Sequence, residues 1–146
     1  MKRALMRISP ILLVAAAMIA CGGSDSTSPN GTVAGSYTAT QFVTTGTTGN
    51  SGQTNQIQLG STLAINLATN GTTTGHLHLA AQGGNPALDY DMAGTWAQSG
   101  STVNFSQTAD TFVRDIQFTV VANGSKWALE GNGSFSGGAV QITLSQ

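Results

Sequence analysis

The chain reads TLAINLATNGTTTGHLHL from Thr62 to Leu79. Leucine and isoleucine alternate with polar or small residues on both sides of Asn70-Gly71. A period of two places apolar side chains on one face of a β-strand, and Asn-Gly favours a tight hairpin because it accepts positive φ. The segment therefore predicts two antiparallel strands, Gln58–Ala68 and Gly75–Gln82.

The same alternation recurs on both sides of this hairpin. It predicts six further strands, at Gly35–Thr44, Leu88–Ala97, Thr102–Gln107, Phe112–Val121, Lys126–Gly131 and Ala139–Ser145. Turn residues separate several of them, at Ser99-Gly100, Asn123-Gly124 and Gly137-Gly138. Eight sequential strands predict an all-β fold, an eight-stranded antiparallel up-and-down barrel that leaves no sheet edge exposed. The long connection Thr45–Asn55 is expected to be a flap over the barrel mouth or a mobile loop.

One parity of the predicted strands supplies the expected interior of the barrel. This inward-facing set is Tyr37, Leu63, Ile65, Leu77, Leu79, Tyr90, Met92, Trp96, Phe105, Ile116, Phe118, Trp127, Leu129, Val140, Ile142 and Leu144. An eight-stranded barrel is just wide enough to fill with side chains or to hold one small ligand. Small residues on the same parity, at Ala39, Gly94 and Gly131, are expected to leave room near the walls. We expect a half-open cup under the Thr45–Asn55 connection.

The first 20 residues have a different composition from the rest. Three basic residues lie within Met1–Arg7, and Ile8–Ala20 is apolar apart from one serine and one proline. A membrane-spanning helix needs about 20 apolar residues, so this run is typical of a signal peptide instead. It ends at Met18-Ile19-Ala20-Cys21, which resembles the lipobox of bacterial lipoproteins. The resemblance implies cleavage before Cys21 and a diacylglyceryl group on its thiol.

The chain divides into three parts on this interpretation. Residues 1–20 form the signal peptide, residues 21–33 the lipidated cysteine with a flexible tether, and residues 34–146 the barrel domain. The tether is rich in Gly, Ser, Thr and Asn and has little apolar surface to bury. Gly22 stands where an Asp would resemble an inner-membrane retention signal. We therefore expect a protein of the bacterial cell envelope, at the outer membrane rather than the inner one.

Charge and cysteine content exclude some classes of partner. Without residues 1–20 the chain keeps two basic and six acidic residues, so its formal charge is 2 − 6 = −4; these are Arg114 and Lys126, and Asp25, Asp89, Asp91, Asp110, Asp115 and Glu130. Nucleic-acid binding requires clustered Lys and Arg, so no nucleic-acid partner is expected. Cys21 is the only cysteine, which excludes an internal disulfide. The membrane is the expected partner, through the lipid.

Two short stretches resemble a known family. Gly35-Ser36-Tyr37 opens the first predicted strand, and the later stretch Ala93-Gly94-Thr95-Trp96 leads into Ser99-Gly100-Ser101-Thr102-Val103-Asn104-Phe105. Together with the long first connection, they resemble the lipocalin and calycin group and lipocalin-like domains of bacterial lipoproteins, over residues 34–146. The resemblance implies a barrel that holds a small apolar ligand and implies no catalysis.

The residues expected to line such a ligand pocket are Tyr90, Trp96, Trp127 and Arg114. Arg114 shares the parity of Phe112 and Ile116 in its predicted strand. It either holds a ligand anion inside the barrel or is a structural residue, stacked on a tryptophan and paired with an aspartate.

Four titratable residues alternate on two neighbouring predicted strands. His76 and His78 share one strand face, and Asp89 and Asp91 share a face on the next strand. The histidines are either metal ligands, with an aspartate as the third that zinc requires, or solvated side chains. The aspartates are either a carboxylate pair for acid–base work or Ca²⁺, or a solvated strand face.

We recognise no Ser/His/Asp motif, phosphate-binding loop or Cys/His cluster in the sequence. An enzyme is therefore not expected, and neither is a resident metal or cofactor. The leading interpretation is a membrane-anchored lipoprotein with a lipocalin-like domain that binds a small apolar ligand. The alternative is a structural or interaction lipoprotein with a filled core and no ligand. The oligomeric state stays open.

Overall fold

The computed structural model describes residues 31–46, 52–135 and 137–146. The predicted signal peptide, Cys21, most of the tether and part of the Thr45–Asn55 connection lie outside the described residues. The elements are β1 (Gly35–Thr45), β2 (Gln53–Asn55), β3 (Thr62–Leu67), β4 (Thr72–Leu79), β5 (Leu88–Ser99), β6 (Thr102–Gln107), α1 (Phe112–Asp115), β7 (Phe118–Asn123), β8 (Lys126–Phe135) and β9 (Gly138–Ser145).

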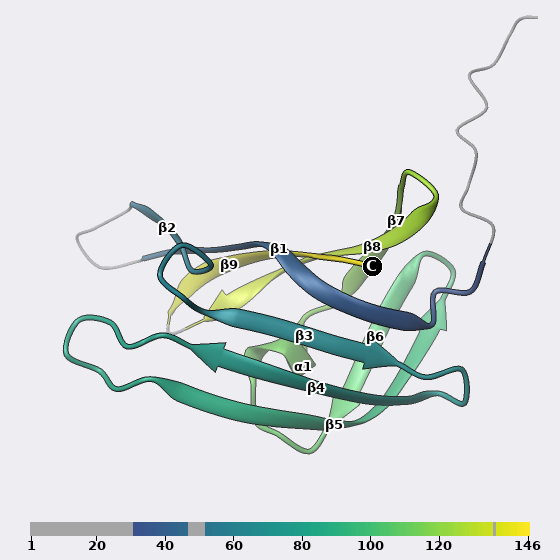
Figure 1. Ribbon diagram of the computed structural model, residues 1–146, viewed down its shortest axis with the longest axis horizontal. Coiled ribbons are helices and arrows are strands. Elements are labelled where there is room, and N and C mark those ends of the chain that lie inside the picture. Colours follow the sequence, from purple (N-terminus) through teal and green to yellow (C-terminus); the bar gives the residue numbers. More distant parts are fainter. Residues whose placement is uncertain (1–30, 47–51, 136) are drawn as a thin grey trace, which may run out of the picture.

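The long strands form a closed barrel. From β3 to β9 each strand pairs antiparallel with the next, and β1 pairs with both β3 and β9 (Figure 1). The pairing of β1 with β9 joins the last strand to the first and so closes the sheet. The predicted eight-stranded up-and-down barrel is therefore confirmed. The short strand β2 pairs with Val43–Thr45 of β1 and lies within the predicted connection.

Strand alternation accounts for the core. In β9, for example, every second residue from Gly138 to Leu144 is buried. The predicted inward-facing set is buried, except that Tyr90, Trp96 and Trp127 are only partly buried. The core also includes Phe42, Val103 and Val113, which were not in that set. Phe105 and Phe118 meet edge to face with ring centroids 5.5 Å apart.

The predicted strand Phe112–Val121 is shorter than expected, because its first residues form α1. The strands β6 and β7 pair through only two residue pairs, Thr102 with Thr119 and Val103 with Phe118. Beyond these pairs the sheet opens, and α1 lies against β6 and β8. Its Val113 is fully buried. The helical turn thus fills a gap that strand pairing leaves open.

The predicted strand Gln58–Ala68 also begins later, at Thr62. The side-chain oxygen of Asn55 accepts hydrogen bonds from the backbone N–H groups of Ile57 and Gln58, at 3.1 and 3.3 Å. Such an Asx turn competes with strand pairing. Leu59, which has the same parity as Leu63 and Ile65 in the predicted strand, therefore lies in a turn and is 48% exposed.

The two ends of the barrel differ. At one end, which we call the turn end, tight turns contain Asn70-Gly71, Gly100 and Asn123-Gly124, and these three glycines have φ of 83°, 60° and 62°. The predicted hairpin tips are confirmed there. At the other, the loop end, longer connections join β1 to β3, β4 to β5 and β6 to β7. Both the start of β1 and the end of β9 lie at the turn end (Figure 1).

Hydrogen bonds fix the entry of the chain at the turn end. The Tyr37 hydroxyl donates to the Val33 carbonyl oxygen at 2.6 Å, and the Gln146 amide donates to the Tyr37 oxygen at 3.0 Å. Burial raises the pKa of Tyr37 to about 12, an effect that the Gln146 hydrogen bond partly offsets. The phenol therefore stays protonated and keeps its donor role. Among the described residues, no helix is long and apolar enough to cross a membrane.

Candidate functional site

Side chains fill the middle of the barrel. Phe42, Phe118 and Leu129 are fully buried there. The room expected beside the small residues is taken: a methyl group added at Gly131 would lie 2.5 Å from Ile116 Cγ2 and 2.7 Å from the Phe118 ring. At Gly94 it would meet the Ser106 carbonyl oxygen. The expectation of space is therefore wrong at Gly131, and the cavities that could hold a ligand lie at the loop end.

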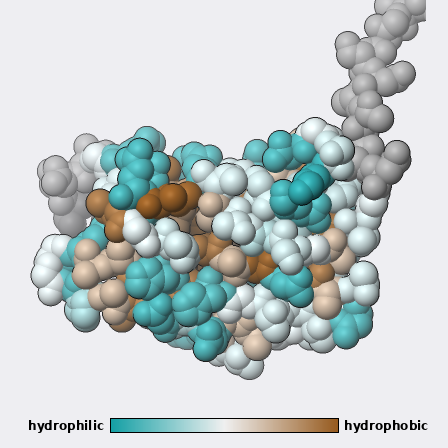
Figure 2. Space-filling view, viewed as in Figure 1, coloured by the Kyte–Doolittle hydropathy of each residue, from teal (hydrophilic) through white to brown (hydrophobic). Residues whose placement is uncertain are grey.

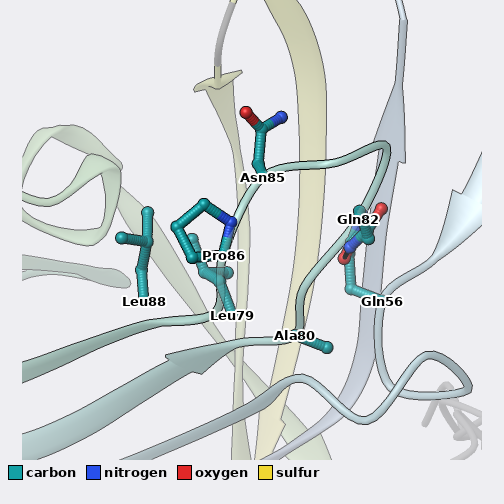
Figure 3. Close-up of a pocket in the computed structure, with 7 residues that line it drawn as sticks. All are labelled: Gln56, Leu79, Ala80, Gln82, Asn85, Pro86 and Leu88. Atoms are coloured by element: carbon teal, nitrogen blue, oxygen red, sulfur yellow. Dashed lines mark hydrogen bonds between the residues drawn. The ribbon is translucent and has the colours of Figure 1, made fainter.

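A cavity at the loop end has a volume of about 520 Å³. We call it the mouth pocket; its lining residues are Gln56, Leu79, Ala80, Gln82, Asn85, Pro86 and Leu88. Figure 3 shows Leu79, Pro86 and Leu88 grouped on one side, with Gln56 and Gln82 on the other. Small-molecule pockets of about 300–1,000 Å³ usually combine such apolar surface with a few placed polar groups.

A second cavity of about 390 Å³ adjoins the mouth pocket, because Leu79 and Leu88 line both. We call it the side recess. Its further apolar lining residues are Leu77, Tyr90 and Phe112, and its polar ones are Asp110, Thr111, Asp115 and Ser134. The two cavities together form a surface depression in which one ligand could contact both Leu79 and Leu88.

The polar wall of the mouth pocket is fixed by hydrogen bonds. Gln56 is 5% exposed, and its amide nitrogen donates to Thr44 Oγ1 at 2.8 Å. Its amide oxygen accepts from the Ser61 hydroxyl at 3.3 Å and from the Gln82 amide. The Ser61 hydroxyl oxygen also accepts from the backbone N–H of Ala80 at 3.0 Å. This network holds the connection between β4 and β5 against the turn before β3.

The structure separates the residues that the sequence grouped as a possible pocket. Tyr90 lines the side recess. Trp96 and Trp127 lie at the turn end, where their indole N–H groups donate to the carbonyl oxygens of Ala68 and Gly31, at 2.9 and 3.3 Å. Whether any of the three contacts a ligand stays a prediction.

Arg114 lies in α1 beside the recess and is about one-third exposed. Its guanidinium donates to Asp110 at 2.5 Å and to Asp115 at 3.2 Å. These contacts agree with the alternative in which Arg114 is a structural residue paired with an aspartate. Both of these aspartates line the side recess.

Sequence reasoning missed the amide residues of the mouth pocket. The signal available was the connection Ala80–Ala87, which carries Gln82 and Asn85 around Gly83-Gly84. Both glycines adopt positive φ, 57° and 86°, and the backbones of Gln82 and Asn85 exchange two hydrogen bonds across this turn, at 3.2 and 2.9 Å. An amide-rich turn between two apolar strands could have indicated this wall.

The four alternating titratable residues form a cluster on the outer face of β4 and β5. Strand register places His76 opposite Asp91 and His78 opposite Asp89. His76 Nδ1 lies 3.0 Å from Asp91 Oδ1, and His76 Nε2 lies 3.2 Å from Asp89 Oδ1. His78 Nδ1 lies 2.8 Å from the same Asp89 oxygen. Figure 2 shows hydrophilic side chains over this part of the surface.

These hydrogen bonds shift two pKa values. The hydrogen bond to Asp91 is the largest cause that raises the pKa of His76, and the one to His78 is the largest cause that lowers the pKa of Asp89. In the described part of the chain, no group of three or more His, Cys, Asp or Glu is arranged to hold a metal ion. The four side chains are joined by hydrogen bonds across the two strands, and each contact is an ion pair only when its histidine is protonated.

Comparisons of the chain with protein-family models, with curated proteins and with solved structures give no match.

Proposed function

We propose that this protein is a lipid-anchored protein of the bacterial cell envelope whose lipocalin-like barrel binds a small apolar ligand at its loop end. The observation that carries the proposal is the mouth pocket, where Leu79, Pro86 and Leu88 lie beside hydrogen-bonded amides. Leu88 is 44% exposed. A ligand that covers it removes apolar surface from water, which is the main driving force for such binding.

The sequence supports the lipid anchor, and the fold indicates which end of the barrel the anchor would hold near the membrane. The lipobox-like stretch ending at Cys21 favours lipid attachment there. The described chain joins the barrel at the turn end, through Gly31 and Val33. A tether at this end leaves the mouth pocket at the opposite end, open to ligands that arrive from the aqueous side. The residue after Cys21 favours the outer membrane in a host with two membranes.

The alternative is a structural or interaction lipoprotein without a ligand. The filled interior favours it, because the barrel axis is occupied by Phe42, Phe118 and their neighbours. The two proposals differ only in whether the depression at the loop end is occupied.

A binding experiment separates the two proposals. The full chain carrying Cys21→Ser, which lacks the lipid, is titrated with N-phenyl-1-naphthylamine, an uncharged dye that fluoresces in apolar sites. We expect Leu88→Asp to weaken dye binding by roughly tenfold, because it places a charge in the apolar wall. Leu59→Asp is the matched control, since Leu59 is similarly exposed at 48% but does not line the pocket. Equal dye binding by both variants favours the structural alternative.

The anchor has its own test. In the native host, the wild-type protein is expected to enter the detergent-rich phase on phase partitioning, and its N-terminal peptide to carry the mass of a diacylglyceryl group on Cys21. The variant Cys21→Ser should remain in the aqueous phase or keep its signal peptide. An unmodified Cys21 at the mature N-terminus of the wild type would overturn the anchor.

A further inference from the structure

We infer that the mouth pocket selects amphiphiles with an uncharged, hydrogen-bonding head group, such as an ester, amide or hydroxyl, over amphiphiles with a carboxylate or phosphate head. The inference rests on the proposed function and names the class of ligand that the same site takes. It follows from two observations, the amide wall of the pocket and the charge of the adjoining recess.

The amide wall matches an uncharged polar head. Gln56 and Gln82 line the pocket opposite its leucines, and Asn85 lies next to Pro86. A side-chain amide offers both donors and acceptors, so it complements groups that also do both. Gln56 is only 5% exposed and uses its amide on Thr44, Ser61 and Gln82, so it holds in place the Gln82 side chain that a head group meets. A head group therefore meets a fixed polar surface, and the apolar tail can lie along Leu79 and Leu88.

The charges near the pocket disfavour an anion. Asp110 and Asp115 line the side recess, and Arg114 pairs with both. Two carboxylates and one guanidinium leave this group with a net charge of −1. Lys126, the other basic residue of the mature chain, starts β8 at the turn end. An anionic head in the depression thus faces a net negative charge, and the described pocket walls contain no basic side chain to offset it.

The test compares head groups on one tail. Monododecanoylglycerol, dodecanoate and dodecyl phosphate each carry a twelve-carbon chain and are used to displace N-phenyl-1-naphthylamine from the full chain carrying Cys21→Ser. We expect the glyceride to bind roughly three- to tenfold more tightly than either anion at low salt. Added salt should narrow this ratio, because it screens the repulsion.

A substitution in the pocket wall should shift the head-group preference towards the anion. Gln82→Lys places a cation in the pocket wall and should raise dodecanoate affinity relative to the glyceride by several-fold. Gln98→Lys is the matched control, because Gln98 is exposed at the turn end, where its amide donates to the Gly100 carbonyl oxygen. Dodecanoate that binds the unsubstituted pocket as tightly as the glyceride overturns this inference alone, while the proposed function stands. A failure of all three amphiphiles to bind overturns both.

Discussion

Gln107 is a buried polar residue whose side-chain amide is unpaired within the described part of the chain. It ends β6 on the inward parity and is 7% exposed, and neither its amide nitrogen nor its amide oxygen has a hydrogen-bond partner there. Burying an unpaired amide costs about 1–3 kcal/mol. We expect Gln107→Met, which keeps the length of the side chain, to raise the free energy of unfolding by about 1 kcal/mol.

Chemical denaturation measures this change. Gln98→Met on the exposed end of β5 serves as the control and should change stability by less than about 0.5 kcal/mol. A loss of stability in Gln107→Met would mean that the amide makes hydrogen bonds the fold requires.

The histidine and aspartate cluster on β4 and β5 makes the stability of the fold depend on pH. Both ring nitrogens of His76 face carboxylate oxygens, and only the protonated ring donates from both. Because the pKa of His76 is raised, its stabilising effect is full below the unfolded pKa of about 6.5 and is lost as pH rises through the folded value. The lowered pKa of Asp89 has the opposite pH dependence. The stabilisation by Asp89 is present above about pH 4 and is lost as pH falls further.

The cluster therefore stabilises the fold most between about pH 4 and 6.5. We expect the difference in thermal midpoint between wild type and His76→Gln to be larger at pH 5.5 than at pH 8.5. The neighbouring strand β3 presents Thr62 and Ala64 opposite the two histidines, so it adds no titrating group. An equal difference at both pH values would show that the ion pairs contribute nothing.

At the scale of elements, β8 depends on a glycine where it crosses the core. Gly131 lies opposite Phe118 in the pairing with β7, and a methyl group there would overlap Ile116 and the Phe118 ring. We expect Gly131→Ala to lower the free energy of unfolding by about 1–3 kcal/mol, the usual cost of overpacking. Gly52→Ala is the control, since a methyl group there meets no atom within 4 Å. Denaturation midpoints that are equal for the two variants would contradict this packing.

Local pattern predicted most of the elements because a half-buried strand has a period of two in the sequence. It succeeded for β3, β4 and their Asn70-Gly71 hairpin, where alternation and turn chemistry agree. It failed at α1, because one helical turn is too short to show a helical period. The reason for the helix also lies elsewhere in the sequence, because α1 fills the gap left where β6 and β7 separate. It failed at Leu59 because the Asn55 side chain ended the strand early.

At the scale of the molecule, the two ends of the barrel have separate roles in our account. The turn end holds the chain entry, through Tyr37, Trp127 and Gln146. The loop end holds the mouth pocket. The sequence predicted a depression at a barrel mouth but placed both tryptophans there. The odd or even position of a residue along a strand predicts which face of the sheet its side chain lies on. It does not predict which end of the barrel the residue occupies.

The most direct test of ligand binding at the loop end is an NMR titration with monododecanoylglycerol. The sample is the ¹⁵N-labelled full chain carrying Cys21→Ser, and the readout is the change in amide chemical shifts. We expect saturable shifts at Gln56, in residues 79–88 and in residues 110–112, with little change at Asn70-Gly71 and Asn123-Gly124. The indole N–H signals of Trp96 and Trp127 should also stay in place. Shifts confined to the turn end, or no saturable shift at all, would contradict it.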